Sequence, residues 1–234
     1  RTAYFMRALH ALNKACLSWN LKTSRGAMTY EGESVMSKDS YSISLISKAE
    51  GWEILRKYHY LATTGKSVSY KSGYNYGLFK DKTLLGVCIF TGFPVPELVH
   101  GMFGLPRNEQ QGMFELSRLC IDPITQKSEY NITSWFVARS IRQLKKDTNV
   151  RAILSYADTE YHSGTIYRAC NFKYYGKTAP KKDFWVIQND STYKKLSRGK
   201  TKGLEGEWRP RSDKHRFLII NDKKLNCNWE EQKI

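Results

Sequence analysis

Apolar and polar positions alternate along most of the chain with two spacings, one typical of strands and one typical of helices. Beyond residue 40, alternating or short apolar runs predict strands at 41–47, 74–80, 84–92, 113–121, 152–156, 184–187 and 217–220. Apolar residues at helical spacing predict helices at 48–58, 132–147 and 163–170. This order of elements predicts an α/β fold, with a mixed, twisted sheet flanked by helices on both faces.

Local features support three of these elements. Ser47 and Glu50 have the spacing of a capping box at the start of the first helix. Asp81-Lys-Thr separates two strand patterns and predicts a hairpin. The helix at 132–147 is amphipathic and can bury one apolar face: Trp135, Phe136, Ile141 and Leu144.

The two ends of the chain differ from residues 41–190, which we expect to form the catalytic domain. Residues 1–21 carry apolar residues near the helical period, and residues 24–39 are polar like a linker. Because Met28 or Met36 could begin a shorter product, we expect residues 1–40 to be an extension outside the core. A basic N-terminal arm is the alternative. Residues 191–234 are expected to form a basic C-terminal extension.

The charge balance adds a polyanionic partner to this picture. The chain has 38 Lys and Arg against 22 Asp and Glu, a formal net charge of +16. Such an excess favours nucleic acid, because binding releases the cations condensed on the phosphates. Cations and aromatic residues alternate in the C-terminal extension, and we expect DNA contacts there from Lys194, Lys195, Arg198, Lys200, Lys202, Trp208, Arg209 and Arg211. A solvated charged surface is the alternative.

The cysteines and the hydropathy pattern bear on the compartment. The five cysteines include no C-x-x-C pair, and Cys88, Cys120 and Cys170 lie in apolar runs typical of a core. An odd number without a signal peptide is consistent with the reducing cytoplasm. No apolar stretch approaches the roughly 18 residues of a membrane span, so we expect no membrane partner. We also expect no metal site.

The first candidate for chemistry is Glu115-Leu-Ser117-Arg118, inside a predicted strand. Simple alternation places Glu115, Ser117 and Leu119 on one face of that strand, and Leu116, Arg118 and Cys120 on the other. An arginine in an apolar strand is costly unless it meets an anion. The anion could be a substrate, or an internal carboxylate such as Glu115 or Asp158.

Other polar groups follow the ends of predicted elements. His59 lies between two tyrosines after the first helix, where it could act as a base or be structural. Asp158 lies at the carboxyl end of a strand, the usual ligand position in α/β sheets. His162-Ser-Gly, which follows it, could instead cap the next helix. Ser134, near the start of the long helix, could bind an anion with help from the helix dipole.

These pieces occur in a recognisable order. The run Arg151-Ala-Ile-Leu-Ser-Tyr-Ala-Asp158, followed by His162-Ser-Gly-Thr-Ile-Tyr167 and Asn171-Phe172, resembles the second half of an acetyltransferase (GNAT) domain. With Tyr58-His-Tyr60 and Glu115-Leu-Ser-Arg118, it resembles the Mom family of phage DNA-modification proteins over about residues 41–190, and weakly beyond. The resemblance implies a GNAT-like fold and conversion of adenine in phage DNA to N6-carbamoylmethyladenine, which protects that DNA from restriction.

The resemblance also implies roles for particular residues. Catalytic roles are expected of His59, Tyr60, Arg118, Ser134, Asp158 and Tyr167. Substrate contacts are expected of Glu115, Ser117, Tyr156, Tyr161 and His162. Tyr167 stands where acetyltransferases often place a tyrosine acid, although it could also be an aromatic residue packed beside Phe172.

The sequence departs from ordinary acetyltransferases at one place. Their glycine loop, whose N–H groups bind the coenzyme A pyrophosphate, corresponds here to residues 126–134, which contain no glycine. Glu129 in this stretch would also repel a pyrophosphate. The expected donor is therefore acyl-CoA, such as acetyl-CoA, or another activated acyl or aminoacyl compound.

The sequence thus predicts an acyltransferase-like enzyme that transfers a carbamoylmethyl or acetamido-type group to the N6 amine of adenine in double-stranded DNA. One rival is an ordinary N-acetyltransferase that acts on a small amine or a protein. The other is a non-catalytic, GNAT-like protein that binds DNA or counters restriction. The oligomeric state stays open, a dimer included.

Overall fold

The structure is a computed structural model, and it describes residues 38–63, 70–71, 73–93, 95–188, 192–196, 199 and 201–233. Residues 1–37, which make up most of the expected N-terminal extension, lie outside the described residues. The same holds for Arg198 and Lys200, two of the expected DNA contacts.

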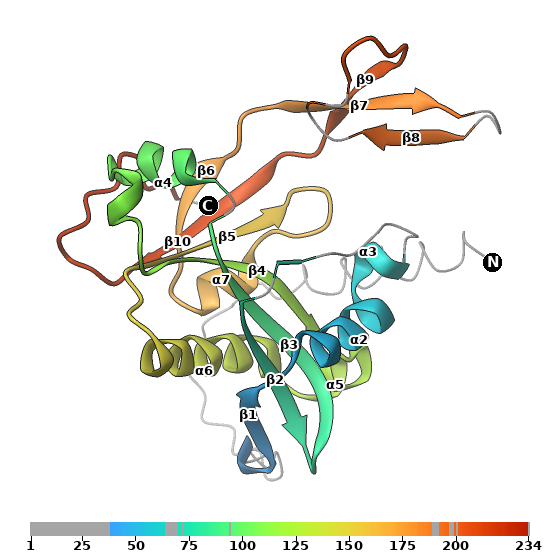
Figure 1. The fold of residues 1–234 in the computed structure, drawn as a ribbon. Helices are drawn as coiled ribbons and strands as arrows, with labels where there is room; N and C mark the ends of the chain where they lie inside the picture. Colours follow the sequence, from blue (N-terminus) through green and yellow to red (C-terminus); the bar gives the residue numbers. More distant parts are fainter. Residues whose placement is uncertain are drawn as a thin grey trace, which may run out of the picture. The chain divides into compact units, whose positions relative to one another are not determined.

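Seven strands form the main sheet in the order β1-β2-β3-β4-β5-β10-β6 (Figure 1). The pair β4 and β5 is parallel, and the other neighbouring pairs are antiparallel. The predicted mixed sheet is therefore confirmed. Its strands are β1 (Tyr41–Leu45), β2 (Tyr74–Lys80), β3 (Thr83–Gly92), β4 (Met113–Ile121), β5 (Ala152–Asp158), β6 (Lys173–Lys177) and β10 (Lys214–Ile220).

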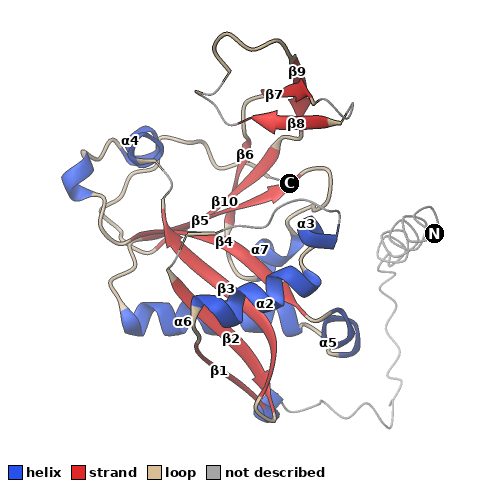
Figure 2. Cartoon of the chain, turned by 45° about the vertical axis from the view of Figure 1, so that its right-hand side comes forward, coloured by secondary structure: helices blue, strands red, loops and turns tan. Residues whose placement is uncertain are grey.

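Helices cover both faces of this sheet (Figure 2). On one face, α6 (Ile132–Asp147) buries Phe136 and Val137 among side chains of the sheet such as Phe90 and Phe217. Each such fully buried side chain stabilises the fold by roughly 1.5–3 kcal/mol. The short helix α7 (Thr165–Ala169) borders the same cluster.

The opposite face carries two separate apolar clusters. Helix α2 (Lys48–Tyr58) packs Leu55 against Val87 of β3, and the one-turn helix α3 (Tyr60–Thr63) follows it. Helix α4 (Pro96–Phe103) packs Met102 against Leu154 of β5. Between these two clusters the face of the sheet carries polar side chains.

A second, three-stranded sheet projects from the end of the main sheet formed by β6 and β10 (Figure 1). It contains β7 (Lys181–Ile187), β8 (Tyr193–Leu196) and β9 (Glu207–Arg211), with β7 in the centre. The chain then returns to the main sheet, where β10 lies between β5 and β6 and buries Phe217 completely. Part of residues 191–234, expected to be an extension, thus belongs to the main sheet.

The predicted local features are present. Ser47 and Glu50 form the capping box of α2, each side chain bonding the backbone N–H of the other residue. Asp81 and Lys82 turn the β2–β3 hairpin with φ values of 48° and 67°, the positive values that such a tight hairpin requires. Asp122, which directly follows β4, opens helix α5 (Pro123–Ser128) by accepting a hydrogen bond from the backbone N–H of Thr125.

Simple alternation along the sequence assigned the side chains of β4 to the two faces of the sheet, and this assignment is wrong beyond Leu116. Phe90 of β3 pairs with Leu116 and Ile89 pairs with Arg118, so Ser117 is an extra residue, a β-bulge. The bulge shifts the alternation by one residue. Leu116 and Leu119 both pack on the α6 face, and Arg118 lies on the opposite face with Glu115.

Gly164, directly before α7, is a position where a side chain cannot be accommodated. Its φ is +76°, and a Cβ atom there would collide with the ring of Phe217. Gly164→Ala should therefore lower the free energy of unfolding by roughly 3 kcal/mol, from left-handed strain plus overpacking.

Chemical denaturation monitored by circular dichroism measures this loss. Gly101→Ala is the matched control, because Gly101 lies in α4 with open space around its Cα, and alanine favours a helix. Equal stability of the two variants would contradict the packing described for Gly164.

Candidate functional site

The polar side chains gather where β4 and β5 separate. Ladder pairing of these parallel strands runs from Met113–Ala152 to Leu116–Ser155 and then stops, although both strands continue. The bulge at Ser117 lies at this point, and its hydroxyl donates to the carbonyl of Ile89. Where the two strands separate, no backbone hydrogen bonds join their described residues, and side chains fill the space between them.

His59 and Tyr60 reach this place from the junction of α2 and α3. Their rings stack at a centroid distance of 4.6 Å, and Tyr60 contacts the ring of Tyr161 at 5.0 Å and that of His162 at 5.4 Å. Residues from two distant segments, each expected at the site for its own reason, thus form one aromatic cluster.

His59 has a defined tautomer in this arrangement. The side chain is only 7% exposed, and Nδ1 accepts a hydrogen bond of 3.2 Å from the backbone N–H of Leu61. Burial lowers the pKa of His59 to about 4, assisted by the nearby Arg118 cation. The ring is therefore neutral at neutral pH, with its hydrogen on Nε2.

Asp158 is held at the end of β5 by two donors. Its Oδ2 accepts a hydrogen bond of 2.8 Å from the hydroxyl of Ser212, and its Oδ1 accepts one of 3.1 Å from the backbone N–H of Glu160. Lys214 is its direct partner on β10, so the two side chains share a face of the sheet.

Charges of both signs lie together here, largely shielded from solvent. Burial raises the pKa of Glu115, while the neighbouring Lys214 and Arg118 oppose that rise. Burial also lowers the pKa of Lys214; Arg211 adds to this effect and Asp158 opposes it. One guanidinium nitrogen of Arg118 donates to the carbonyl of Ser117 at 2.6 Å. The cluster therefore combines two carboxylates with two cations on one face of the sheet.

Tyr167 reaches the strand separation from α7, on the other side of the sheet. Its ring packs against Phe172 at 5.5 Å and Phe217 at 5.2 Å, so it is also the packed aromatic residue that was the alternative. Its hydroxyl lies 3.5 Å from the carbonyl of Tyr156. Burial raises the pKa of Tyr167 to about 12, and likewise that of Tyr156, so both hydroxyls stay protonated at neutral pH.

Ser134 has a different place from the other expected site residues. Its hydroxyl donates to the carbonyl of Asn131 in the first turn of α6, and its own carbonyl accepts from the thiol of Cys170. Within the described part of the chain, no hydrogen bond or ring contact joins Ser134 to the cluster at the strand separation. Its expected role as an anchor remains a prediction.

Two residues of the cluster, Ser212 and Lys214, were not expected there. Lys214-His-Arg216 was expected to be part of the basic C-terminal extension, residues 191–234. The apolar run that follows Lys214 predicts a buried strand, and a lysine at the start of such a strand needs a partner within the fold. This was the feature of the sequence from which its place at the site could have been inferred. Ser212 carries no comparable sign in the sequence.

Several backbone N–H groups of the segment after β4 are bonded within the protein. The backbone N–H of Thr125 bonds the carboxylate of Asp122, and those of Glu129 and Ile132 bond the carbonyls of Thr125 and Glu129. These N–H groups are therefore committed inside α5 and the following turn. These particular N–H groups are not free for the contacts with which glycine loops bind the coenzyme A pyrophosphate.

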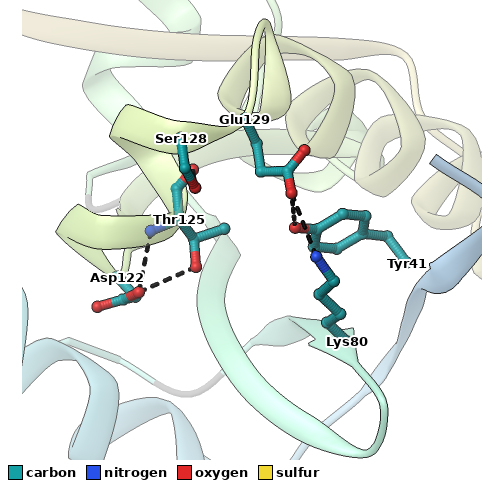
Figure 3. A network of polar contacts seen from close by, with 6 residues as sticks. All are labelled: Tyr41, Lys80, Asp122, Thr125, Ser128 and Glu129. Carbon is teal, nitrogen blue, oxygen red and sulfur yellow. Dashed lines mark hydrogen bonds and ion pairs between the residues drawn. The ribbon is translucent and has the colours of Figure 1, made fainter. Parts of the chain in front are cut away.

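Glu129 is fixed beside the start of α6 by a network with the paired strands β1 and β2 (Figure 3). One carboxylate oxygen accepts from the Tyr41 hydroxyl at 2.8 Å and from the Lys80 ammonium at 3.2 Å. These partners hold the pKa of Glu129 below its usual range. The carboxylate thus remains charged at a position where it would repel a pyrophosphate.

The expected DNA contacts that the structure describes fall into two groups. Lys194, Lys202 and Trp208 are exposed, and no ion pair involving them occurs among the described residues. Lys195, Arg209 and Arg211 each have a carboxylate partner: Asp183, Glu207 and Asp183 respectively.

Other features of the described residues bear on the expectations from sequence. Cys88, Cys120 and Cys170 are buried thiols, as predicted for core residues. No three His, Cys, Asp or Glu side chains in the described ranges form a group that could hold a metal ion. None of the described helices is long and apolar enough to cross a membrane.

Solved acetyltransferases are similar to this chain in structure. One is the acetyltransferase of Bacillus subtilis in complex with CoA, at 13% identity and a TM-score of 0.43, covering 77% of this chain and 97% of that one. Another is the ribosomal-protein-S18-alanine N-acetyltransferase of Escherichia coli, at 12% identity and a TM-score of 0.46, covering 80% and 99%. A third is yncA of Salmonella typhimurium with acetyl-CoA, at 9% identity and a TM-score of 0.46, covering 79% and 96%.

The mixed sheet, its helices on both faces and the polar cluster where β4 and β5 separate define a mixed α/β protein with a polar site at the strand separation. A model of the Mom protein family matches residues 40–233, which include the small sheet and β10. The chain therefore belongs to the Mom protein family. No curated protein matches it in sequence.

The depressed pKa of His59 predicts acid sensitivity. Between about pH 6.5 and pH 4 the unfolded chain binds a proton at His59 that the folded chain does not, so the free energy of unfolding falls as pH falls. Replacing His59 by Phe, which keeps the ring stacked on Tyr60, should remove up to about 3 kcal/mol of this dependence.

Denaturation curves of both proteins at pH 7 and pH 4.5 measure the effect. The residual acid sensitivity of His59→Phe would include His162 and His215, whose pKa values burial also lowers, and carboxylates such as Glu129, whose pKa hydrogen bonds lower. An unchanged pH dependence in the variant would show that His59 is not the buried neutral group described.

Proposed function

We propose that this protein transfers a carbamoylmethyl or acetamido-type group from an activated donor to the N6 amine of adenine in double-stranded DNA, protecting phage DNA from restriction in the host cytoplasm. Membership of the Mom family supports an enzyme of the group-transfer type. The observation that carries the proposal is that Asp158, Arg118 and Lys214 lie together at the strand separation, which Tyr167 reaches from the other side of the sheet.

Asp158 is the proposed base. The N6 amine of adenine is a poor nucleophile because its lone pair is delocalised into the ring, so it must lose a proton as it attacks. His59 is a poorer candidate, since its Nδ1 lone pair already accepts from Leu61 and its Nε2 carries the hydrogen. The carboxylate of Asp158 is oriented by two donors and retains lone pairs for a third.

The proposed step is balanced as follows. N6 forms a bond to the electrophilic carbon of the donor, and Asp158 takes the N6 proton. The leaving group departs with its bonding pair and takes a proton from the Tyr167 hydroxyl, which is protonated at neutral pH. Arg118 and Lys214 stabilise negative charge that develops on the donor. Solvent then removes the proton from Asp158 and returns one to Tyr167.

The target base must leave the duplex to reach these groups. Base flipping costs a few kcal/mol and needs an aromatic or apolar wall to hold the extruded base. Tyr60 and Tyr161, whose rings lie 5.0 Å apart beside Asp158, are proposed to supply that wall. The exposed cations of the C-terminal segment are proposed to hold the DNA backbone.

Asp158→Asn and Arg118→Ala should each abolish base modification. The first removes the proton acceptor without changing its shape, and the second removes a half-buried cation beside the donor. Mass spectrometry of nucleosides from DNA of cells that express each variant measures the result, and a new adenine derivative is expected for the unsubstituted protein.

Two exposed positions offer matched controls. Asp81→Asn lies in the β2–β3 turn and Arg142→Ala lies on the outer face of α6, and both should leave modification unchanged. Modified adenine in either site variant would rule out the assigned role. A protein that binds DNA without modifying it would support the non-catalytic alternative.

Ser212 should act as a positioning residue through Asp158. Ser212→Ala removes one hydrogen bond to the carboxylate and should lower kcat about tenfold, with little change in the KM for DNA. Ser212→Thr keeps a hydroxyl and should restore most of the rate. A fall in stability with kcat unchanged would instead give Ser212 a purely structural role.

A further inference from the structure

The small sheet has two faces of different chemistry. Directly paired residues of antiparallel strands share a face, and Phe184 in the central strand pairs with Leu196 and Trp208. Asp183, its neighbour in the chain, pairs with Arg209 and therefore faces the other way. We name these the Trp208 face (Lys182, Phe184, Val186, Lys194, Leu196, Trp208 and Pro210) and the Asp183 face (Lys181, Asp183, Trp185, Ile187, Tyr193, Lys195, Glu207, Arg209 and Arg211).

Of the four cations on the Asp183 face, three are paired within the protein and the fourth, Lys181, is exposed. Asp183, whose side chain is 14% exposed, binds the ammonium of Lys195 at 2.6 Å and lies 3.8 Å from the guanidinium of Arg211. Arg209 binds Glu207 at 2.8 Å and lies 3.8 Å over the ring of Tyr193. A phosphate that approached this face would meet both carboxylates as well as the cations.

The Trp208 face has the opposite character. Lys182 and Lys194 are exposed, and both carboxylates of the three strands lie on the other face. The large apolar side chain of Trp208 is 51% exposed. Its ring packs on the ring of buried Phe184, with 5.1 Å between the ring centroids. A supported, exposed indole on the same face as two exposed lysines suits a sugar or base beside a phosphate backbone.

The small sheet is joined directly to the site. Strand β9 continues into β10 through Ser212 and Asp213. Ser212 bonds Asp158, and both the backbone N–H and the hydroxyl of Thr159 donate to the carbonyl of Asp213. DNA held by the small sheet is therefore held within a few residues of the proposed base.

We propose that the Trp208 face contacts the DNA that flanks the target adenine, with Lys182 and Lys194 on phosphates and Trp208 against a sugar or base, and that the Asp183 face only supports the sheet. This inference rests on the proposed function. It separates the cations of the small sheet into those that contact DNA, on the Trp208 face, and those that support the sheet, on the Asp183 face. Lys194 and Lys195, adjacent in sequence and equal in charge, have different roles.

The adjacent lysines give a matched test. Lys194→Gln and Lys195→Gln remove the same charge, and the amide introduced by the second substitution can still donate to Asp183. Fluorescence anisotropy with a labelled DNA duplex, over a range of salt concentrations, gives the affinity and its salt slope for each variant. We expect Lys194→Gln to weaken binding severalfold and to reduce the slope by about one, and Lys195→Gln to leave both near the unsubstituted values.

Trp208→Ala and Lys182→Gln test the rest of the face. Loss of the indole contact should weaken binding roughly tenfold with little change in salt slope, because stacking releases no counterions. Lys182→Gln should behave like Lys194→Gln. Thermal unfolding of each variant identifies any that lose the small sheet. A variant with the melting temperature and the DNA affinity of the unsubstituted protein counts against the contact assigned to that residue.

The outcomes separate this inference from the proposed function. An unsubstituted protein that shows no salt-dependent DNA binding and no adenine modification would overturn the proposed function. Normal binding and modification, with Lys195→Gln as damaging as Lys194→Gln or more so, would overturn only the assignment of the faces.

Discussion

The extra residue at Ser117 in β4 sets the geometry on which the site depends. It shifts the alternation of the strand, so that Glu115 and Arg118 share one face, and it stands where the ladder between β4 and β5 ends. Regular alternation would direct Arg118 among the apolar side chains beneath α6. A charged group buried there without a partner costs several kcal/mol. The bulge thus places the cation among the groups of the proposed site.

Burial between two apolar clusters is the second constraint, and it shifts the pKa values of several groups at the site. It favours the neutral form of His59, Glu115 and Lys214 alike, while the opposite charges nearby counteract it for the last two. The same effect keeps Tyr167 protonated. A neutral histidine that donates, a protonated tyrosine and paired opposite charges can therefore coexist at neutral pH.

Several elements could be predicted because short-range patterns determine them. The α6 helix has the predicted bounds, and the capping box at Ser47 and the turn at Asp81 formed as expected. The strand β6 and the helices α4 and α5 were not predicted. They are short, and their stability comes from partners far away in sequence, such as β10 for β6 and the face of the main sheet for α4. No periodicity within them indicates these partners.

The sequence by itself determined the family, the order of the main elements and most of the residues at the strand separation, because these depend on residue identity and local period. Only the tertiary structure decided which side chains meet. Glu115 joins Arg118 through a bulge, Lys214 joins Asp158 through the register of β10, and Lys194 and Lys195 point to opposite faces of the small sheet. The direction of a side chain in a strand depends on pairing with distant segments, and a shift of one residue reverses it.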